Sequence, residues 1–227
     1  MRGIMISRAP ALREQVYINI RNRIVNGDLE PGRVLVEVEL ADELQVSRTP
    51  VSNALIMLKE RGLVEEEGSR LRVPILTLPD VTQLYWCRMA HDGLASRLAA
   101  QRITDIEILK LESCLLAWET PVQENDYSAL WVNDLNFHQM IYQLADNKHL
   151  LRFSETTMEL GAAYQRNTFR RMTDPNSGTE RSRSDVRVEH KAIFEAIAAH
   201  RPDEAEEAAR QHIRMVIAHL EQADVVL

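Results

Sequence analysis

Four residues with metal-binding side chains fall at helical spacing on apolar stretches of the second half of the chain. Asp134 and His138 lie four residues apart, so one face of a helix carries both of them among apolar neighbours. His190 and His212 each fall on the apolar face of a later predicted helix, and Met215 is expected on the same inner face as His212. Burying such groups without partners is costly. The four residues therefore either satisfy one another as a polar network in the core or bind a metal.

An aspartate with three histidines on facing helices is a suitable site for Zn²⁺, Ni²⁺ or Mn²⁺. Four protein ligands leave room for water or a ligand oxygen when the geometry is octahedral. The polar network remains the alternative, because a single inward histidine is more often a satisfied core residue than a ligand. The other histidines lack this convergence, and we expect them at the surface: His91, His149, His200 and His219.

The elements that must position these residues are helices. Helix-forming residues dominate the second half, and aromatic residues are few. The predicted helices are residues 79–101, 104–119, 124–146, 148–172, 183–200 and 202–224. An antiparallel all-α bundle of six or seven helices is the expected result. Residues 173–179 predict a mobile polar loop. The segment from Pro74 to Pro79 predicts a linker, which gives domains at residues 1–76 and 77–227.

The first 76 residues follow a different pattern. Helices are predicted at residues 12–26, residues 37–44 and from Ser47 onward, with Ser47 as the N-cap and Pro50 in the first turn. Gly62 ends the third helix. Residues 63–66 and 71–73 then predict two strands around Gly68. This order of elements is typical of a winged helix-turn-helix, so the whole chain is expected to be mainly α.

The composition is that of a globular protein, with 45% hydrophobic and 27% charged residues. Residues 1–75 hold eleven basic and eleven acidic residues, so the net charge of −7 belongs to the remainder. The first 27 residues carry five arginines and one acid, and local charge governs attraction to phosphate. Cys87 and Cys114 are too few for a disulfide framework or a zinc ribbon, and we expect reduced, partly buried thiols. A stretch of about 18 apolar residues is absent, so we expect a cytoplasmic protein.

Residues 12–76 resemble the DNA-binding domain of the GntR regulator superfamily. The resemblance is carried by residues 27–32 (Gly-Asp-Leu-Glu-Pro-Gly), 40–41 (Leu-Ala), 47–51 (Ser-Arg-Thr-Pro-Val), 54–55 (Ala-Leu) and 62–64 (Gly-Leu-Val). It implies that the third helix enters the major groove from its amino-terminal end. Arg48 then contacts guanine O6/N7 or a phosphate, and Ser47 and Thr49 contact phosphates or base edges.

Two departures from the family pattern leave the operator sequence open. Ser52 and Asn53 stand where family members usually carry Arg-Glu; Asn53 either reads adenine or is solvated. The glycine usual near the wing tip is displaced to Gly68, and Arg70 stands closer to that place. Arg70 and Arg72 either reach the minor groove or are solvated. A rival use of the winged helix is protein binding.

Residues 77–227 look like the ligand-binding domain of the FadR subfamily, called FCD. Many members have Asp-x-x-x-His on one helix and one histidine on each of the last two helices. Asp134 and His138 match the first motif, and His190 and His212 match the others. The resemblance implies a divalent metal site, with zinc favoured and nickel or manganese as alternatives. Six helices in place of seven would suggest the VanR-like branch.

Arg88 is the candidate for binding an effector. It shares a face with apolar residues of the first bundle helix, and in the family an arginine here often helps bind an acidic effector. A guanidinium beside an open metal position suits a carboxylate. Tyr164 and Arg166 are further candidates for the same cavity. The alternative for Arg88 is a structural ion pair with Asp92, four residues later.

The function implied is a homodimeric, ligand-responsive transcription regulator, expected to repress, on a palindromic operator. A small organic or sugar acid is the expected effector, and no membrane partner is expected. One rival is a metal-dependent enzyme in the helical bundle; against it, the ligand set offers no separate general base, because Glu189 is expected to point away from the face of His190. The other rival is a regulator with a purely structural metal.

Overall fold

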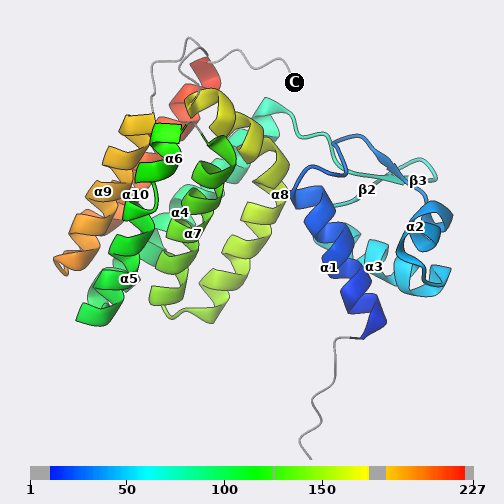
Figure 1. The fold of residues 1–227 in the computed structure, drawn as a ribbon, viewed down its shortest axis with the longest axis horizontal. Helices are drawn as coiled ribbons and strands as arrows, with labels where there is room; N and C mark the ends of the chain where they lie inside the picture. Colours follow the sequence, from blue (N-terminus) through cyan, green and yellow to red (C-terminus); the bar gives the residue numbers. More distant parts are fainter. Residues whose placement is uncertain (1–10, 125, 174–182, 223–227) are drawn as a thin grey trace, which may run out of the picture. The chain divides into compact units, whose positions relative to one another are not determined.

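The computed structural model describes residues 11–124, 126–173 and 183–222, and the chain divides into two compact units, Met1–Leu76 and Thr77–Leu227 (Figure 1). The first unit contains three helices and a small sheet, and the second is helical throughout its described part. The mainly α fold class, with a winged helix followed by a helical bundle, is confirmed. No helix among these residues is long and apolar enough to cross a membrane.

In the first unit, three helices pack around an apolar core. They are α1 (Leu12–Val25), α2 (Glu37–Leu44) and α3 (Arg48–Glu60). Ile20 of α1 and Leu55 and Leu58 of α3 have no exposed surface, which follows from their helical spacing. Gln45 connects α2 to α3 in the left-handed conformation, with φ of 53°. Ser47 is the N-cap of α3, as predicted, but its side chain makes no capping hydrogen bond.

The wing is a three-stranded antiparallel sheet in the order β1-β3-β2. Its strands are β1 (Val34–Leu35), β2 (Glu65–Glu67) and β3 (Arg70–Arg72). The hairpin turns at Gly68, which has a φ of 63°. Strand β2 starts two residues later than predicted, because Leu63 and Val64 are buried in the core before the hairpin begins. Strand β1 was not predicted, since two residues are too short to show a period.

In the second unit, a capping box starts the first helix. Thr77 and Asp80 bond each other's backbone N–H groups, so the helix begins at Leu78, one residue before the predicted start at Pro79. Within the described residues there are seven helices: α4 (Leu78–Arg102), α5 (Asp105–Leu116), α6 (Glu119–Glu124), α7 (Tyr127–Leu144), α8 (Lys148–Thr173), α9 (Arg183–Ala198) and α10 (Pro202–Gln222). The short α6 makes the count seven, which removes the basis for choosing the VanR-like branch. Residues 174–179 of the predicted loop lie outside the described part.

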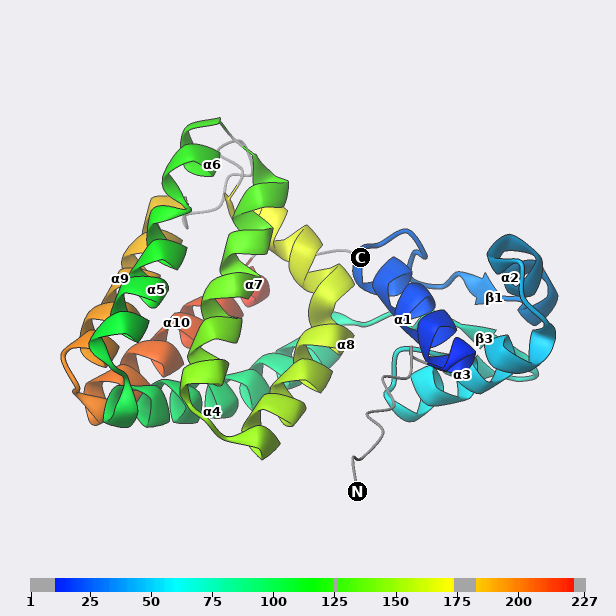
Figure 2. The same cartoon turned by 60° about the horizontal axis from the view of Figure 1, so that its bottom comes forward.

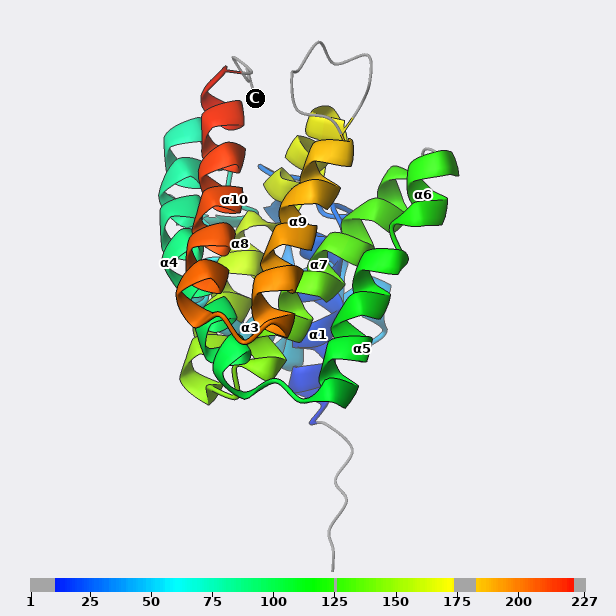
Figure 3. The same cartoon turned by 90° about the vertical axis from the view of Figure 1, so that its left-hand side faces the viewer.

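Helices α4 and α10 lie side by side, with α9 next to α10 (Figures 2 and 3). Gly93 allows their close approach, because a Cβ there would come within 3.0 Å of the Arg210 side chain. Helix α10 is therefore covered on two sides. His219, expected at the surface, is buried, and Met215, expected inside, is 42% exposed. Cys87 is exposed and Cys114 is half-buried, so the expectation of partial burial holds for Cys114 only.

Candidate functional site

Three histidines from three helices meet in the interior of the bundle. His138 on α7, His190 on α9 and His212 on α10 each offer a ring nitrogen, and these nitrogens lie within 4.8 Å of one another. All three side chains are buried, and His190 has no exposed surface. Nitrogens that bind one zinc ion at about 2.1 Å in tetrahedral geometry are about 3.4 Å apart. The three rings would therefore have to close by up to about 1.4 Å to share one ion.

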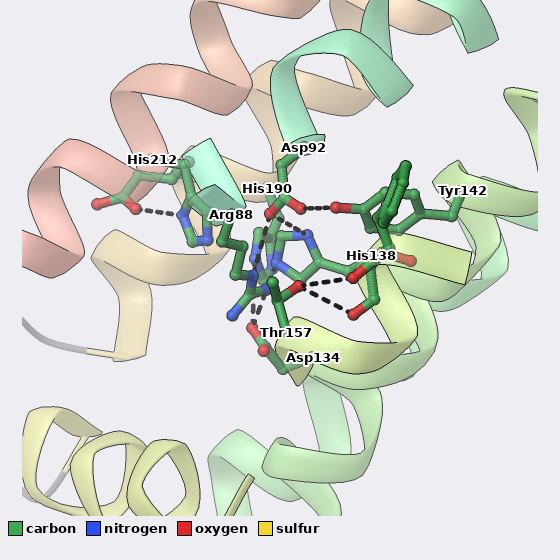
Figure 4. Close-up of polar contacts among 11 residues, drawn as sticks. Arg88, Asp92, Asp134, His138, Tyr142, Thr157, His190 and His212 are labelled. Carbon is green, nitrogen blue, oxygen red and sulfur yellow. Dashed lines mark hydrogen bonds and ion pairs between the residues drawn. The ribbon is translucent and has the colours of Figure 1, made fainter. Parts of the chain in front are cut away.

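Asp134 lies at the same point. Its Oδ1 is 3.4 Å from Nε2 of His190 and 3.9 Å from Nε2 of His138, and the residue is 6% exposed. The structure thus brings together all four residues that the sequence singled out as metal ligands (Figure 4). Each is in place because its helix turns an apolar stripe toward the interior, and the polar residue interrupts that stripe.

Two further carboxylates stand behind the histidines. Oε2 of Glu189 accepts a hydrogen bond of 2.7 Å from Nδ1 of His212, and Oδ2 of Asp92 lies 3.4 Å from Nδ1 of His138. Because these carboxylates face Nδ1, the Nε2 atoms of His212 and His138 point away from Glu189 and Asp92. Sequence reasoning expected the Glu189 side chain to point away from the face of His190 and missed its contact with His212. The contact crosses from α9 to α10, so no spacing within one helix signals it.

Arg88 and Tyr142 complete a buried network around Asp92. Nε of Arg88 is 3.2 Å from Oδ2 of Asp92, and the hydroxyl of Tyr142 donates a hydrogen bond to Oδ1. The ion pair proposed as the alternative role of Arg88 is therefore present. Burial alone would lower the pKa of Arg88, but the carboxylates of Asp92 and Asp134 outweigh it and raise that pKa, so the guanidinium stays charged. Burial and the adjacent Asp92 raise the pKa of Tyr142, so its hydroxyl remains a donor.

Two buried nitrogens at the site have no hydrogen-bond partner among the described residues. They are Nε2 of His138 and Nη2 of Arg88. Burial, followed by the neighbouring Arg88, His190 and His212, lowers the pKa of His138 well below its usual range. A neutral histidine offers a lone pair, and a metal ion requires one. Within the described residues, the bundle interior therefore holds a histidine nitrogen of His138 and a charged N–H donor of Arg88 that both lack a hydrogen-bond partner.

Aromatic rings hold His190 in place. Phe137 stacks on it with ring centroids 4.6 Å apart, and Trp118 meets it edge-on at 5.1 Å. Neither aromatic side chain has any exposed surface. Trp118 is therefore a built-in fluorescent reporter beside the site.

Among the described residues, the charged groups around the histidines are mostly acidic. They are Asp92, Asp134 and Glu189, with Arg88 paired to Asp92.

The candidate DNA-contacting residues of α3 lie on its outer face. Ser47, Arg48, Thr49 and Asn53 are exposed and Ser52 is half-buried, whereas the inner face carries the core residues. Arg48 is 3.6 Å from Glu37 of α2, and both side chains remain accessible. This exposed helix face, which begins at the N-terminus of α3, has the shape and donor groups of a recognition helix.

One of the two candidate arginines of the wing is held by ion pairs with residues of the wing itself. Arg72 bonds Glu65 at 2.6 Å and Glu67 at 2.7 Å, while Arg70 at the start of β3 is exposed. The carboxylate of Glu66 accepts a hydrogen bond from Lys59 of α3. Of the two arginines, Arg70 is therefore the one more accessible to a phosphate.

Comparisons with known proteins place the two units in one family. The first unit matches the model of the bacterial regulatory proteins of the gntR family over residues 12–70, and the second matches the FCD domain over residues 83–215. The chain belongs to the GntR family of transcription regulators, in the subfamily with an FCD domain. As a GntR-family regulator it is related to proteins that bind DNA operators.

Relatives of this GntR–FCD chain match it over nearly its whole length. The HTH-type transcriptional regulator YdhC of Bacillus subtilis is 28% identical over 208 residues, which cover 90% of this chain and 86% of the relative. The HTH-type transcriptional repressor RspR of Escherichia coli is 26% identical over 210 residues, with 92% and 89% covered. The solved structure of E. coli McbR/YncC has the same fold, with a TM-score of 0.75 at 20% identity over 94% of this chain and 99% of that one. The names of these relatives indicate a regulator, not an enzyme.

Two expected effector residues cannot be placed at the site. Tyr164 and Arg166 belong to α8, but their side chains lie outside the described residues. Arg88 is the effector candidate whose side chain is located, and it lies close to the three histidines.

Proposed function

We propose that this regulator senses a small carboxylic acid through a divalent metal held by Asp134, His138, His190 and His212. The observation that carries the proposal is the buried group of three histidines. Beside it, His138 Nε2 and Arg88 Nη2 have no hydrogen-bond partner within the part of the chain that the structure describes. Zinc is the first choice for this ligand set, and nickel and manganese are the alternatives.

The metal and Arg88 together define the class of effector. A divalent cation with an open position accepts a carboxylate oxygen as a Lewis acid. Nη2 of Arg88, which bonds none of the described residues, supplies a charged donor for a second oxygen of the same acid. Organic and sugar acids carry such groups, and Tyr164 and Arg166 are proposed as additional contacts. The enzymatic rival is disfavoured, because Glu189 is bonded to His212 and so is not free to act as a general base.

Binding of the acid would compete with a contact already present. Nε of Arg88 lies 3.2 Å from Oδ2 of Asp92, so an acid that bonds the guanidinium competes with Asp92 for it. Asp92 and Arg88 both belong to α4, which begins two residues after the first unit ends. A shift of α4 would thus be passed to the linker, and it changes DNA affinity only if the acid binds the two states unequally.

The DNA side of the proposal assigns base and phosphate contacts to the outer face of α3. Arg48, Thr49 and Asn53 face solvent there, with Ser47 and Ser52 beside them. Arg70 is the proposed wing contact, and Arg72 is a weaker candidate because two glutamates hold it. A homodimer would present two such helices to a palindromic operator, and the relative named a repressor supports repression as the direction of control.

The test is a metal titration in which binding is monitored by the fluorescence of Trp118. Ni²⁺ or Co²⁺ added to chelator-stripped protein should quench it, because the indole ring lies 5.1 Å from the ring of His190. The His190→Ala variant should lose the response, and Trp118→Phe should lose the signal while keeping metal affinity in a chelator competition. Quenching of equal strength in His190→Ala would contradict the proposed site.

The regulatory step needs a separate test. A duplex selected from a random pool by the wild-type protein serves as the operator, and its affinity is measured with candidate acids in the presence of zinc. An acid that stabilises the metal-loaded protein should change that affinity. If metal stabilises the protein and no saturating acid alters DNA binding, the metal is purely structural and the sensing proposal is wrong.

A further inference from the structure

Helix α9 supplies two consecutive residues to the site, and they reach it differently. His190 points into the histidine group, whereas the preceding Glu189 bonds Nδ1 of His212 on α10 at 2.7 Å. Successive side chains on a helix are about 100° apart, so Glu189 leaves α9 on the flank that faces α10. Glu189 is 18% exposed in its side chain, and His212 only 4%. The carboxylate therefore closes the outer side of His212.

The contact determines which nitrogen of His212 is available. An ionised carboxylate only accepts hydrogen bonds, so Nδ1 must carry the proton and donate it. The lone pair is then on Nε2, the nitrogen that does not face Glu189. Asp92 likewise faces Nδ1 of His138, although at the longer distance of 3.4 Å.

We propose that Glu189 is a positioning residue for the metal: it fixes His212 in the tautomer and ring orientation that directs Nε2 to the ion, and it makes that nitrogen a stronger ligand. This inference rests on the proposed metal binding. Carboxylates behind a ligand histidine typically contribute 10- to 100-fold to metal affinity. Asp92 does not take the place of Glu189, because it stands at Nδ1 of His138 and also bonds Arg88 and Tyr142.

Zinc affinity of the full chain tests the inference, measured by competition with a fluorescent chelator. Glu189→Ala removes the acceptor and should weaken zinc binding by about 10- to 100-fold. Glu189→Gln keeps an oxygen that can accept from Nδ1 and loses only the charge, so it should fall between wild type and Glu189→Ala. The matched control is Glu195→Ala on the same helix, whose carboxylate pairs with Lys191 at the surface; its zinc affinity should equal that of wild type.

A role limited to joining α9 and α10 predicts a different result. It would lower the unfolding temperature of the metal-free protein in Glu189→Ala and leave the zinc affinity of the folded protein unchanged. That outcome would overturn the inference. The expected result is reduced zinc affinity with metal-free unfolding close to that of Glu189→Gln. If wild type binds no zinc while it remains folded, the metal proposal itself is wrong, and the inference falls with it. If wild type binds zinc and Glu189→Ala binds it equally well, only the inference about Glu189 is refuted.

Discussion

Replacing Arg88 by methionine should destabilise the bundle, because it leaves the carboxylate of Asp92 buried without its counter-charge. The two side chains are 5% and 3% exposed, so water cannot solvate what remains. Removing one partner of a buried ion pair costs about 3–5 kcal/mol. Tyr142 still donates a hydrogen bond to Asp92, and His138 lies near it, which places the expected loss of unfolding free energy at about 3 kcal/mol.

A double-mutant cycle isolates this interaction. Asp92→Asn alone leaves the Arg88 guanidinium buried without a carboxylate and should also be destabilising. In the double variant Arg88→Met/Asp92→Asn, the amide oxygen still accepts from Tyr142, and neither of the two replaced residues is charged. We expect it to recover at least about 2 kcal/mol relative to the sum of the two single losses.

Urea unfolding of the metal-free protein, followed by tryptophan fluorescence, is the appropriate assay. All three tryptophans, Trp86, Trp118 and Trp131, belong to the second unit, so the signal reports on the bundle. Arg97→Met provides a control, because that arginine forms an exposed ion pair with Asp203 and should change stability much less. Strict additivity in the cycle, or a loss for Arg88→Met no larger than that for Arg97→Met, would refute the reasoning.

Three further predictions concern other parts of the chain. Arg48→Ala should weaken binding to the selected duplex by about 1–3 kcal/mol, and Arg72→Ala should weaken it less because the wing glutamates hold that side chain; equal losses in fluorescence anisotropy would count against this ordering. The pKa of His138 is lowered in the folded protein, so the unfolded chain takes up a proton at a higher pH than the folded chain does. The stability of the metal-free protein should therefore fall as the pH drops below about 6.5, by at most about 1.4 kcal/mol per pH unit from this residue. His138→Asn should make that slope shallower in urea unfolding. Gln45→Gly should stabilise the first unit by about 0.5–1 kcal/mol, because glycine adopts the left-handed conformation without strain; calorimetry showing a lower unfolding temperature would contradict it.

The sequence predicted the inward residues well wherever one helix presents one face to the core. On α7, Asp134 and His138 share the buried stripe with Leu130, Phe137 and Ile141, and all five are buried. The helical period of 3.6 residues determines that arrangement, so spacing alone was sufficient. The winged helix was predictable for a related reason, since its turns and caps carry local sequence signals.

The errors occur where the environment is set by other elements. His219 and Met215 were misplaced because α10 is covered by both α4 and α9, which widens and rotates its buried face beyond a single stripe. Glu189 was missed because its partner is on α10, and contacts between helices leave no period in the sequence. The extra helix α6 was missed because it falls between the predicted helices 104–119 and 124–146, and six residues are too few to show a pattern.

Thermal unfolding of chelator-stripped wild type, alone and with metals and small carboxylic acids, tests the central claim most directly. A ligand at 100 times its dissociation constant adds about 2.7 kcal/mol of stability. We expect one metal to raise the unfolding temperature of wild type, one acid to raise it further only when that metal is present, and neither to act on His138→Ala. If no metal stabilises the folded wild type, or if His138→Ala responds as wild type does, the buried histidines and Asp134 form a polar network in the core, and the metal-dependent sensor is contradicted.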